Sequence, residues 1–459
     1  MSLTSYRAAP PRVPGGPYNA PGFVSRKRFR QFNQNNFSKG ENRPPFSSAN
    51  IEPCKRAIGN WTELRVRLLK QTRFHSSLSP FTCDAFGSPY SFPVRIVNVP
   101  LGQRSYEIQI GPNLLRQLGT HVHRLGLGQR CAIISDSNVA PKYAASVRNI
   151  LAKAGFESVL ITFRAGETAK KLDSVQRCYD QLAAHRLERK SFVIALGGGV
   201  VGDLAGFVAA TYLRGIAFIQ LPTTLLAHVD SSVGGKVGVN LKAGKNLVGA
   251  FYQPRLVICD LDTLKTLPER EYRSGLAEVI KYGIIYDAPF LEQLERDLPK
   301  LLKRDAKSLS GVIARCCEIK AEVVGKDETE SGLRAILNFG HTIGHGLEAI
   351  SRYGKYLHGE AISIGQIAAA ELSAKQLGLP SKDVERIRNL FQRAGLPTEV
   401  RLNAIERKKL FAAMRLDKKV SAGEIKFVLA ERIGKVVWGQ NVSAGSIEWA
   451  LGQVTPGLR

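Results

Sequence analysis

Short apolar runs that alternate with helical patterns are the feature that most constrains the fold of this chain. Runs typical of strands occur at residues 95–100, 106–110, 130–135, 158–163, 191–196 and 218–221, with helical patterns at 141–154 and 172–185. Strands that alternate with helices lie parallel in one sheet, with helices on both faces. The sequence therefore predicts a doubly wound, Rossmann-like α/β domain, which we expect to span residues 92–267.

Helical patterns dominate the second half of the chain. They cover residues 269–286, 289–303, 306–326, 336–352, 359–377 and 381–394, and one short strand is expected at 425–430. We therefore expect a second, mostly α-helical domain at residues 268–459. No stretch of eighteen or more residues is both uncharged and uniformly apolar, so we expect no membrane span.

Residues 1–85 differ in composition from the rest. They are rich in Pro, Ser, Asn and Arg, lack acidic residues before Glu41, and include the basic cluster 26–30. Such a composition cannot bury a core and is typical of an organellar transit peptide. We expect a disordered plastid leader and a location in the chloroplast stroma. A disordered tail and a nucleic-acid-binding arm are the alternatives.

The charge and the cysteines restrict the partners and the compartment. A net charge of +26 suits phosphates, carboxylates or nucleic acid, although a solvated basic surface is the simpler explanation for most of the lysines. The folded part has no basic motif interleaved with aromatic residues, so no nucleic-acid partner is expected. The seven cysteines form no C-x-x-C pair, which is typical of free thiols in a reducing compartment.

A glycine-rich turn follows the strand expected at 191–196. Gly197, Gly199 and Gly202 match the pattern G-x-G-x-x-G, in which backbone N–H groups at a helix N-terminus meet a pyrophosphate. The acidic residue expected about twenty positions later is missing, so a tight packing turn is the alternative. Asp136, at the end of an earlier strand, is a candidate for contact with an adenosine ribose.

Two further pairs of hydroxyls lie near strand ends, Thr223 with Thr224 and Thr263 with Thr266. Each could bind a ligand or cap the following helix, and the sequence leaves both possibilities open.

Charge and glycine occur together at residues 230–236 and in the glycine-rich stretch 233–249. Asp230 and Lys236 flank two glycines, which suits a backbone that closely approaches a charged small molecule, and Lys245 and Asn246 follow. The glycines at five positions argue against regular structure. We therefore expect a mobile loop that brings ammonium groups to an anion, with a solvated lysine loop as the alternative.

Three of the eight histidines, His341, His345 and His358, fall within eighteen residues. Neutral imidazoles with one carboxylate form a catalytic zinc set, and spacing alone selects His341 with His345, one helical turn apart, plus a distant carboxylate. Glu278 and Lys281, three residues apart in apolar surroundings, form either a surface ion pair or part of a site.

These motifs, in this order, resemble those of 3-dehydroquinate synthases over about residues 92–450. The most specific stretches are at 197–215, 222–240, 244–254, 274–283 and 333–348. With the basic leader, the resemblance is to the plastid form of plants. It implies conversion of 3-deoxy-D-arabino-heptulosonate 7-phosphate to 3-dehydroquinate and phosphate. NAD would oxidise the C5 hydroxyl, phosphate would be eliminated, the hydride would return, and an intramolecular aldol would close the ring.

The resemblance also implies the ligand contacts. NAD would contact Asp136, Asn138, Glu167, Lys170, Gly199, Val200, Val201, Gly202, Asp203, Thr223, Thr224, Lys236, Lys245, Thr263, Leu264, Lys265 and Thr266. Catalysis falls to Asp230, Lys236, Lys281, Lys320, Arg334, Asn338 and His345. Substrate binding falls to Asn246, Lys418 and Arg214, the last reaching a neighbouring subunit in an expected homodimer. A divalent metal, zinc or cobalt, would be held by Glu278, His341 and His358, and His345 would instead contact the substrate.

Two positions depart from the family pattern. His228 stands in place of glutamine, and variable spacing leaves open which lysine near residue 418 contacts phosphate. Two related enzymes remain alternatives, a cyclase that acts on sedoheptulose 7-phosphate and a metal-dependent polyol dehydrogenase. The sedoheptulose substrate has no carboxylate, so Lys320, Arg334 and Asn338 together favour dehydroquinate formation.

Overall fold

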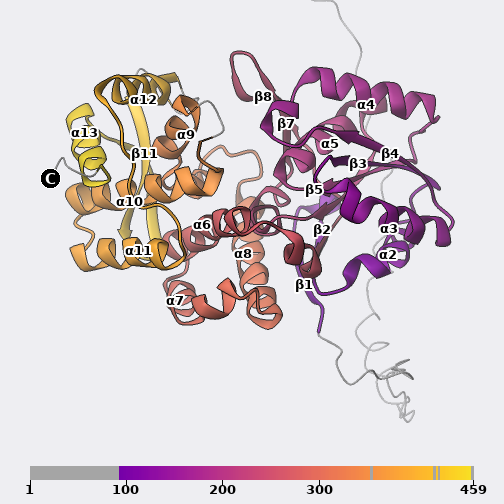
Figure 1. Ribbon diagram of the computed structural model, residues 1–459, viewed down its shortest axis with the longest axis horizontal. Helices are drawn as coiled ribbons and strands as arrows, with labels where there is room; N and C mark the ends of the chain where they lie inside the picture. The colour runs from indigo at the N-terminus through magenta and orange to yellow at the C-terminus, as the bar shows by residue number, and fades with distance from the viewer. Residues whose placement is uncertain (1–92, 352–354, 417–419, 422–423, 456–459) are drawn as a thin grey trace, which may run out of the picture. The chain divides into compact units, whose positions relative to one another are not determined.

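The structure is a computed structural model that describes residues 93–351, 355–416, 420–421 and 424–455 (Figure 1). The expected leader and Lys418 lie outside the described residues.

A seven-stranded sheet forms the N-terminal part. Its strands are β1 (Arg95–Val99), β2 (Tyr106–Gly111), β3 (Arg130–Asp136), β4 (Glu157–Phe163), β5 (Phe192–Gly197), β6 (Ala217–Pro222) and β9 (Leu256–Asp260). The order across the sheet is β1-β2-β9-β6-β5-β3-β4. All neighbours are parallel except β1 and β2, which pair antiparallel.

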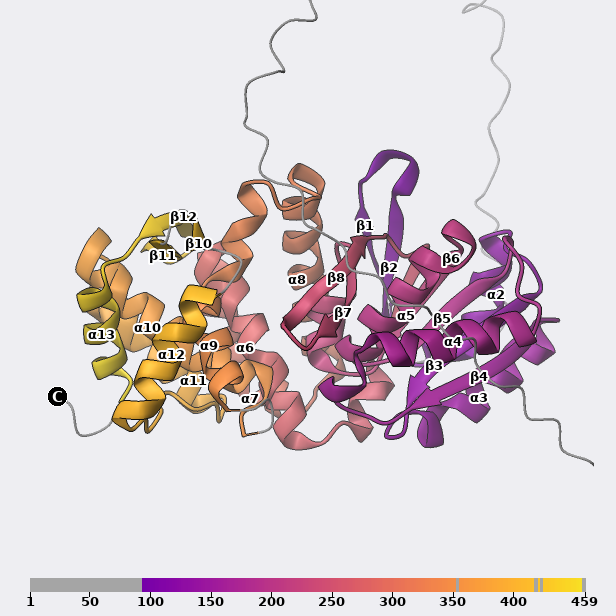
Figure 2. The same ribbon diagram turned by 90° about the horizontal axis from the view of Figure 1, so that it is seen from above.

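Helices cover both faces of this sheet (Figures 1 and 2). On one face, α3 (Ala140–Lys153) and α2 (Leu118–Arg124) pack on residues such as Ile133 and Ile194. On the other, α4 (Leu172–Ala184) and α5 (Gly199–Thr211) pack on alternate residues of the same strands. Strands buried on both faces read as continuous apolar runs, which explains why the sequence pattern was sufficient to predict this doubly wound α/β architecture.

The connections place a crevice at the carboxyl ends of β3 and β5. From β3 the chain passes to β4 at one edge and then returns to β5 on the other side of β3. Where the strand order reverses, the connections that follow the two strands run to opposite faces of the sheet and leave a crevice between them. Ligands of doubly wound sheets usually bind in this crevice.

The glycine-rich segment 233–249 is not the irregular loop that its composition predicted. It holds β7 (Lys236–Leu241) and most of β8 (Gly244–Phe251), which form an antiparallel hairpin. Gly238 pairs with Gly249, and a Cβ at Gly249 would lie 2.3 Å from the Val237 carbonyl oxygen. The glycines therefore allow a close backbone approach within a hairpin.

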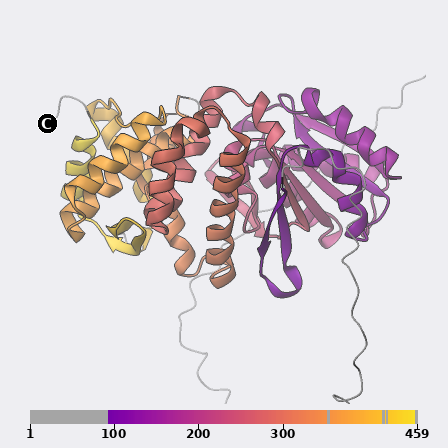
Figure 3. The same cartoon turned by 90° about the horizontal axis from the view of Figure 1, so that it is seen from below.

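The C-terminal part is mostly helical, as predicted (Figure 3). Its helices are α6 (Glu269–Ile285), α7 (Ala288–Leu302), α8 (Ala306–Lys326), α9 (His341–Ile350), α10 (His358–Leu377), α11 (Ser381–Arg393), α12 (Ala404–Leu416) and α13 (Ala444–Gln453). The strand expected at 425–430 is β11 (Glu424–Arg432), which lies between β10 (Val420–Ser421) and β12 (Lys435–Asn441). Helix α8 contacts β1 and β2, so the sheet and the helices share one apolar core.

The helix expected at 336–352 begins only at His341. Residues Leu333–Asn338 form a separate 3-10 turn, η7. Gly340 then adopts φ 78°, and a Cβ there would lie 2.5 Å from Gln366. This break places His341 at the first position of α9.

None of the helices in the described part of the chain combines the length and apolarity that a membrane crossing requires.

Candidate active site

Glu278 and Lys281 form a buried ion pair on α6. Their side chains are 0% and 1% exposed, so the pair is not a surface feature. Burial alone would lower the pKa of Lys281, but Glu278 and Asp230 outweigh it and raise the pKa. The amine of Lys281 therefore remains protonated in the interior, where its charge interacts with the carboxylates of Glu278 and Asp230.

Glu278 and two imidazoles, from three different helices, lie close together. Its Oε1 lies 3.6 Å from His341 Nε2 on α9 and 3.5 Å from His358 Nε2 on α10. Potential ligand atoms of these three residues all lie within 4.8 Å of one another. The structure thus brings together the set that the family resemblance assigned to a divalent metal.

His345 belongs to a different set of potential ligands. His341 and His345 are one turn apart, with ring centroids separated by 5.1 Å. However, the set that contains His345 also contains Glu348 and His358 rather than His341. The expectation from spacing, that His341 and His345 ligate together, is therefore not met among the described residues. Only tertiary packing decides which carboxylate each imidazole meets.

The chemistry of the Glu278 set fits a divalent cation. Both carboxylate oxygens of Glu278 are buried and make no hydrogen bond in the described structure, apart from the ion contacts given above. A buried ionised carboxylate needs compensating charge, and two imidazoles with one carboxylate suit zinc or cobalt. Burial would lower the pKa of His358, but its contacts with Glu278 and Glu348 outweigh burial and raise the pKa to about 10.

Asp230 extends the charged cluster from the sheet side. It lies in a π-helical turn, η5 (Ala227–Ser231), after β6. Its Oδ1 accepts hydrogen bonds from Tyr282 OH at 3.1 Å and from Lys320 Nζ at 2.5 Å. Burial would raise the pKa of Asp230, but the ammonium groups of Lys320 and Lys281 outweigh it and lower the pKa. Asp230 is thus an ionised carboxylate between two lysines.

Lys236, Arg334 and Asn338 form a second polar group at this site. Glu330, which the sequence did not single out, forms an ion pair with Lys236 and accepts a hydrogen bond from Asn338 Nδ2 at 3.0 Å. Arg334 is 1% exposed, and its Nη2 donates to the Gly234 carbonyl at 2.9 Å. The signal that could have revealed Glu330 is its place four residues before Arg334 in a charged segment.

Gly234 and Gly235, between Asp230 and Lys236, lie close to the side chains of other residues. A Cβ at Gly234 would lie 2.5 Å from Arg334 Nη2, and one at Gly235 would lie 2.6 Å from the Gln253 side chain. Both glycines have positive φ, 93° and 65°. The expected close approach to a charged group exists, but in this structure that group is the guanidinium of Arg334.

The turn 197–202 is tightly packed. A Cβ at Gly197 would lie 2.5 Å from Val201, and one at Gly202 would lie 2.8 Å from Gln220 Oε1. The packing explanation of these glycines therefore holds. Gly199 begins α5 at the crevice, so the turn can still present a helix N-terminus there.

Asp136 also lies at the crevice, at the end of β3. Its Oδ1 accepts hydrogen bonds from the backbone N–H groups of Asn138 and Val139 at 2.8 and 3.0 Å. The carboxylate thereby shapes the turn that leads into α3.

The two threonine pairs differ from one another. Thr224 Oγ1 accepts from Ala227 N at 3.1 Å, which is a cap. Thr223 Oγ1 is buried and makes no hydrogen bond in the described structure, which leaves it suited to a ligand. Thr263 donates to the Asp260 carbonyl at 2.7 Å, and Thr266 bonds Tyr143, so both support the turn η6 (Leu261–Thr266).

The other two residues of this turn expected to contact NAD differ in exposure. Leu264 is buried, whereas Lys265 is 74% exposed and pairs with Asp262 at 2.7 Å.

The hairpin β7–β8 joins the two halves of the site. Lys170 pairs with Asp203 and donates to Asn246, while Asn240 on β7 donates to Glu167 Oε1 at 2.8 Å. Asn240 was not predicted. The neighbouring Lys245 reaches the opposite side and donates to Glu348 Oε1 at 3.2 Å. The expected cofactor residues and the histidine cluster are therefore linked through one hairpin.

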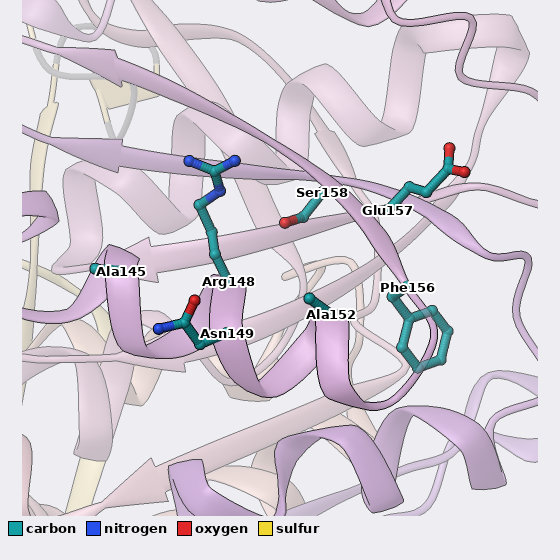
Figure 4. A pocket seen from close by; sticks show the side chains of 7 residues that line it. All are labelled: Ala145, Arg148, Asn149, Ala152, Phe156, Glu157 and Ser158. Atoms are coloured by element: carbon teal, nitrogen blue, oxygen red, sulfur yellow. The ribbon is translucent and has the colours of Figure 1, made fainter.

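Two other regions lie apart from this site. Arg214 is exposed, with φ 70°, and its expected contact with a second subunit stays a prediction. A surface hollow between α3 and β4 is lined by Arg148, Asn149, Phe156 and Glu157, among others (Figure 4). It contains none of the residues predicted for function.

Comparisons with known proteins agree with this architecture. A family model for the N-terminal part of 3-dehydroquinate synthases matches residues 160–274, and one for the C-terminal part matches residues 275–420. The 3-dehydroquinate synthase of Desulforamulus reducens is 49% identical over 357 residues, which are 78% of this chain and 99% of that protein.

Solved structures of two cyclases are similar. The structure of 2-deoxy-scyllo-inosose synthase with carbaglucose-6-phosphate, NAD+ and Co2+ matches with a TM-score of 0.72 at 28% identity, covering 78% of this chain and 99% of that chain. That of 2-epi-5-epi-valiolone synthase from Streptomyces hygroscopicus subsp. jinggangensis, with NAD+ and Zn2+, has a TM-score of 0.71 at 28% identity, covering 77% and 98%.

The fold and the site define an enzyme class in which a dinucleotide-type α/β domain and a helical domain with a metal-ligand cluster share one active site. The chain belongs to the 3-dehydroquinate synthase family. Because the relative described above is bacterial, the comparison supports the family and not its plastid plant form.

Proposed function

We propose that this chain converts 3-deoxy-D-arabino-heptulosonate 7-phosphate to 3-dehydroquinate and phosphate, with NAD and a divalent metal. The observation that carries the proposal is the hairpin contact between the two halves of the site. Asn246 contacts Lys170 beside Asp203, and the adjacent Lys245 contacts Glu348 beside His358. A hydride acceptor in the crevice and a metal at Glu278 can therefore act on one substrate.

The bound groups would supply the redox and Lewis-acid chemistry, hydride uptake by NAD and polarisation of a substrate oxygen by the metal. Glu278, His341 and His358 would hold the metal, and Thr223 with the N-terminus of α5 would meet NAD. These assignments draw on the buried side-chain oxygens of Glu278 and Thr223, which make no hydrogen bond in the described structure.

The other residues bind and orient the substrate. Lys236 and Arg334 supply cations for its phosphate and carboxylate, and Asn338 supplies an amide. Since Glu330 pairs with Lys236 and Asn338, a substrate anion would compete with this carboxylate. Burial lowers the pKa of Lys320 despite the opposing charge of Asp230, which makes Lys320 suited to exchange a proton with Asp230 or the substrate.

A cyclase acting on sedoheptulose 7-phosphate is the second candidate, favoured by the similarity to cyclase structures. The three side chains Lys320, Arg334 and Asn338 suit a substrate with both carboxylate and phosphate. Phosphate release should be measured with each of the two sugar phosphates, with and without NAD. Release from the heptulosonate that needs NAD but accumulates no NADH is expected. Release from sedoheptulose 7-phosphate alone, or stoichiometric NADH, would reject the proposal.

We also propose that residues 1–85 direct the chain to the chloroplast stroma and that it acts as a homodimer. The leader proposal draws on the absence of acidic residues before Glu41 and on the relative, which matches only 78% of this chain with 99% of its own length. The dimer proposal draws on Arg214, an exposed arginine at a turn.

A further inference from the structure

Glu348 on α9 contacts two elements at once. Its side chain is 8% exposed. Its Oε2 lies 3.5 Å from His358 Nδ1 on α10, and its Oε1 accepts a hydrogen bond from Lys245 Nζ on β8 at 3.2 Å. A nearly buried carboxylate between an imidazole and a hairpin lysine is not required for packing, since an apolar side chain would cost less desolvation.

The contact with His358 is made by the ring nitrogen that faces away from Glu278. His358 Nε2 lies 3.5 Å from Glu278 Oε1, while Nδ1 faces Glu348. A histidine that ligates through one nitrogen is oriented by the acceptor for the N–H of the other. For His341 that acceptor is the carbonyl of Phe339, 3.2 Å from Nδ1. Glu348 occupies the corresponding place for His358.

The contacts of Glu348 support this arrangement. Its two carboxylate oxygens face different donors, with Oε2 toward His358 Nδ1 and Oε1 toward Lys245 Nζ. A carboxylate accepts hydrogen bonds on both oxygens, so Glu348 is able to accept one from neutral His358 and one from protonated Lys245 simultaneously.

We propose that Glu348 is a positioning residue of the metal centre. It holds the His358 imidazole with Nε2 toward the metal and, through Lys245, fixes the β7–β8 hairpin beside that centre. The inference rests on the proposed metal site at Glu278, His341 and His358. The competing role is that of a direct ligand, because His345, Glu348 and His358 form a second set of potential ligands.

Zinc affinity separates these roles without any assay of turnover. Metal-free protein is titrated with zinc against a competing chelator for the wild type, Glu348→Ala, Glu348→Gln and Glu278→Gln. Glu371→Gln is the matched control, because Glu371 is another largely buried carboxylate in an ion pair, with Arg388. We expect Glu348→Ala to weaken zinc binding roughly 10- to 100-fold. Glu348→Gln should weaken it less, since an amide oxygen still accepts the Nδ1–H, and Glu371→Gln should not change it.

The outcomes are distinct. If Glu348→Gln loses as much affinity as Glu278→Gln, Glu348 is a ligand and the positioning role is wrong. If Glu348→Ala binds zinc as the wild type does, the inference fails while the proposed metal site stands. If the wild type binds no more tightly than Glu278→Gln, both fail. Glu348→Gln has the shape of the native residue, so it remains informative if the alanine variant does not fold.

The hairpin contact has a separate readout. Lys242, between β7 and β8, is exposed, and the rate of tryptic cleavage after it reports how firmly the hairpin is held. Glu348→Ala should raise this rate several-fold relative to Glu371→Gln, as measured by mass spectrometry. Equal rates in the two variants would overturn the role of Glu348 in fixing the hairpin.

Discussion

His341 and His345 lie one turn apart on α9 with ring centroids 5.1 Å apart, yet they belong to different sets of potential ligands. His341 Nε2 lies 3.6 Å from Glu278 Oε1, whereas the set with His345 has Glu348 as its carboxylate. Helical spacing brings the two imidazoles together, and the packing of α10 against both α6 and α9 decides which carboxylate each imidazole meets.

The first prediction concerns these histidines. His358→Ala should lose bound zinc, because it removes one of three protein ligands. His345→Ala should keep zinc, with affinity reduced at most roughly 100-fold, and should lose turnover. The metal content of the two purified variants tests this. A zinc-free His345→Ala with a loaded His358→Ala would show that the assignment is reversed.

The second prediction concerns the hydroxyls after β6. Thr223→Val should weaken NAD binding about tenfold, close to the value of one hydrogen bond, without loss of stability. Thr224→Val should lower the free energy of unfolding by about 1 kcal/mol, because it removes a cap. NAD titration by fluorescence and urea unfolding measure both effects. Unchanged NAD affinity in Thr223→Val would contradict the proposed contact.

The third prediction concerns the buried ion pair on α6. Lys281→Met leaves Glu278 and Asp230 without their shared cation and should lower the free energy of unfolding of the metal-free protein by about 3 kcal/mol or more. Lys326→Met is the control, because the pair of Lys326 with Glu322 is exposed, and its loss should cost about 0.5 kcal/mol or less. Similar urea midpoints for the two variants would argue against the interior placement of this pair.

The fourth prediction concerns His228, which is 0% exposed. Burial lowers its pKa from 6.5 to about 4, although a hydrogen bond with the Pro222 carbonyl opposes the shift. Between these values the unfolded chain binds a proton that the folded chain does not, so stability falls as the pH drops from 6.5 to 4.

Between pH 6.5 and 4 the free energy of unfolding falls by about 3 kcal/mol because of His228. His228→Gln should remove this part of the pH dependence. Urea unfolding at several pH values should show a shallower acid slope for His228→Gln than for the wild type. His185→Gln, at an exposed position, should leave the slope unchanged. If the slopes of wild type and His228→Gln coincide, His228 does not stay neutral in the folded protein.

The fifth prediction concerns the leader. Deletion of residues 1–85 should leave phosphate release intact and abolish import into isolated chloroplasts. Loss of soluble, folded protein on deletion would contradict the assignment of these residues as a transit peptide.

The architecture followed from local patterns. The apolar runs of β3, β5 and β6 and the helical periodicity after Pro268 predicted the two kinds of structure, because buried strands and amphipathic helices differ in period. Glycine content was a poorer guide. It suggested an irregular segment at 233–249, where the structure has a hairpin whose strands approach closely at Gly238 and Gly249.

The sequence by itself therefore determined the fold class, the clustering of histidines and, through resemblance to a family, the candidate residues. Tertiary structure alone decided which residues meet. Glu278 and His341 are 63 positions apart in sequence, and no local pattern reports that their side chains lie 3.6 Å from each other. Glu348 and Asn240 were missed for the same reason. Spacing reports only neighbours along one element, such as Glu278 and Lys281. A buried carboxylate that water cannot reach needs further polar partners, and those of Glu278 come from other helices that only packing brings close.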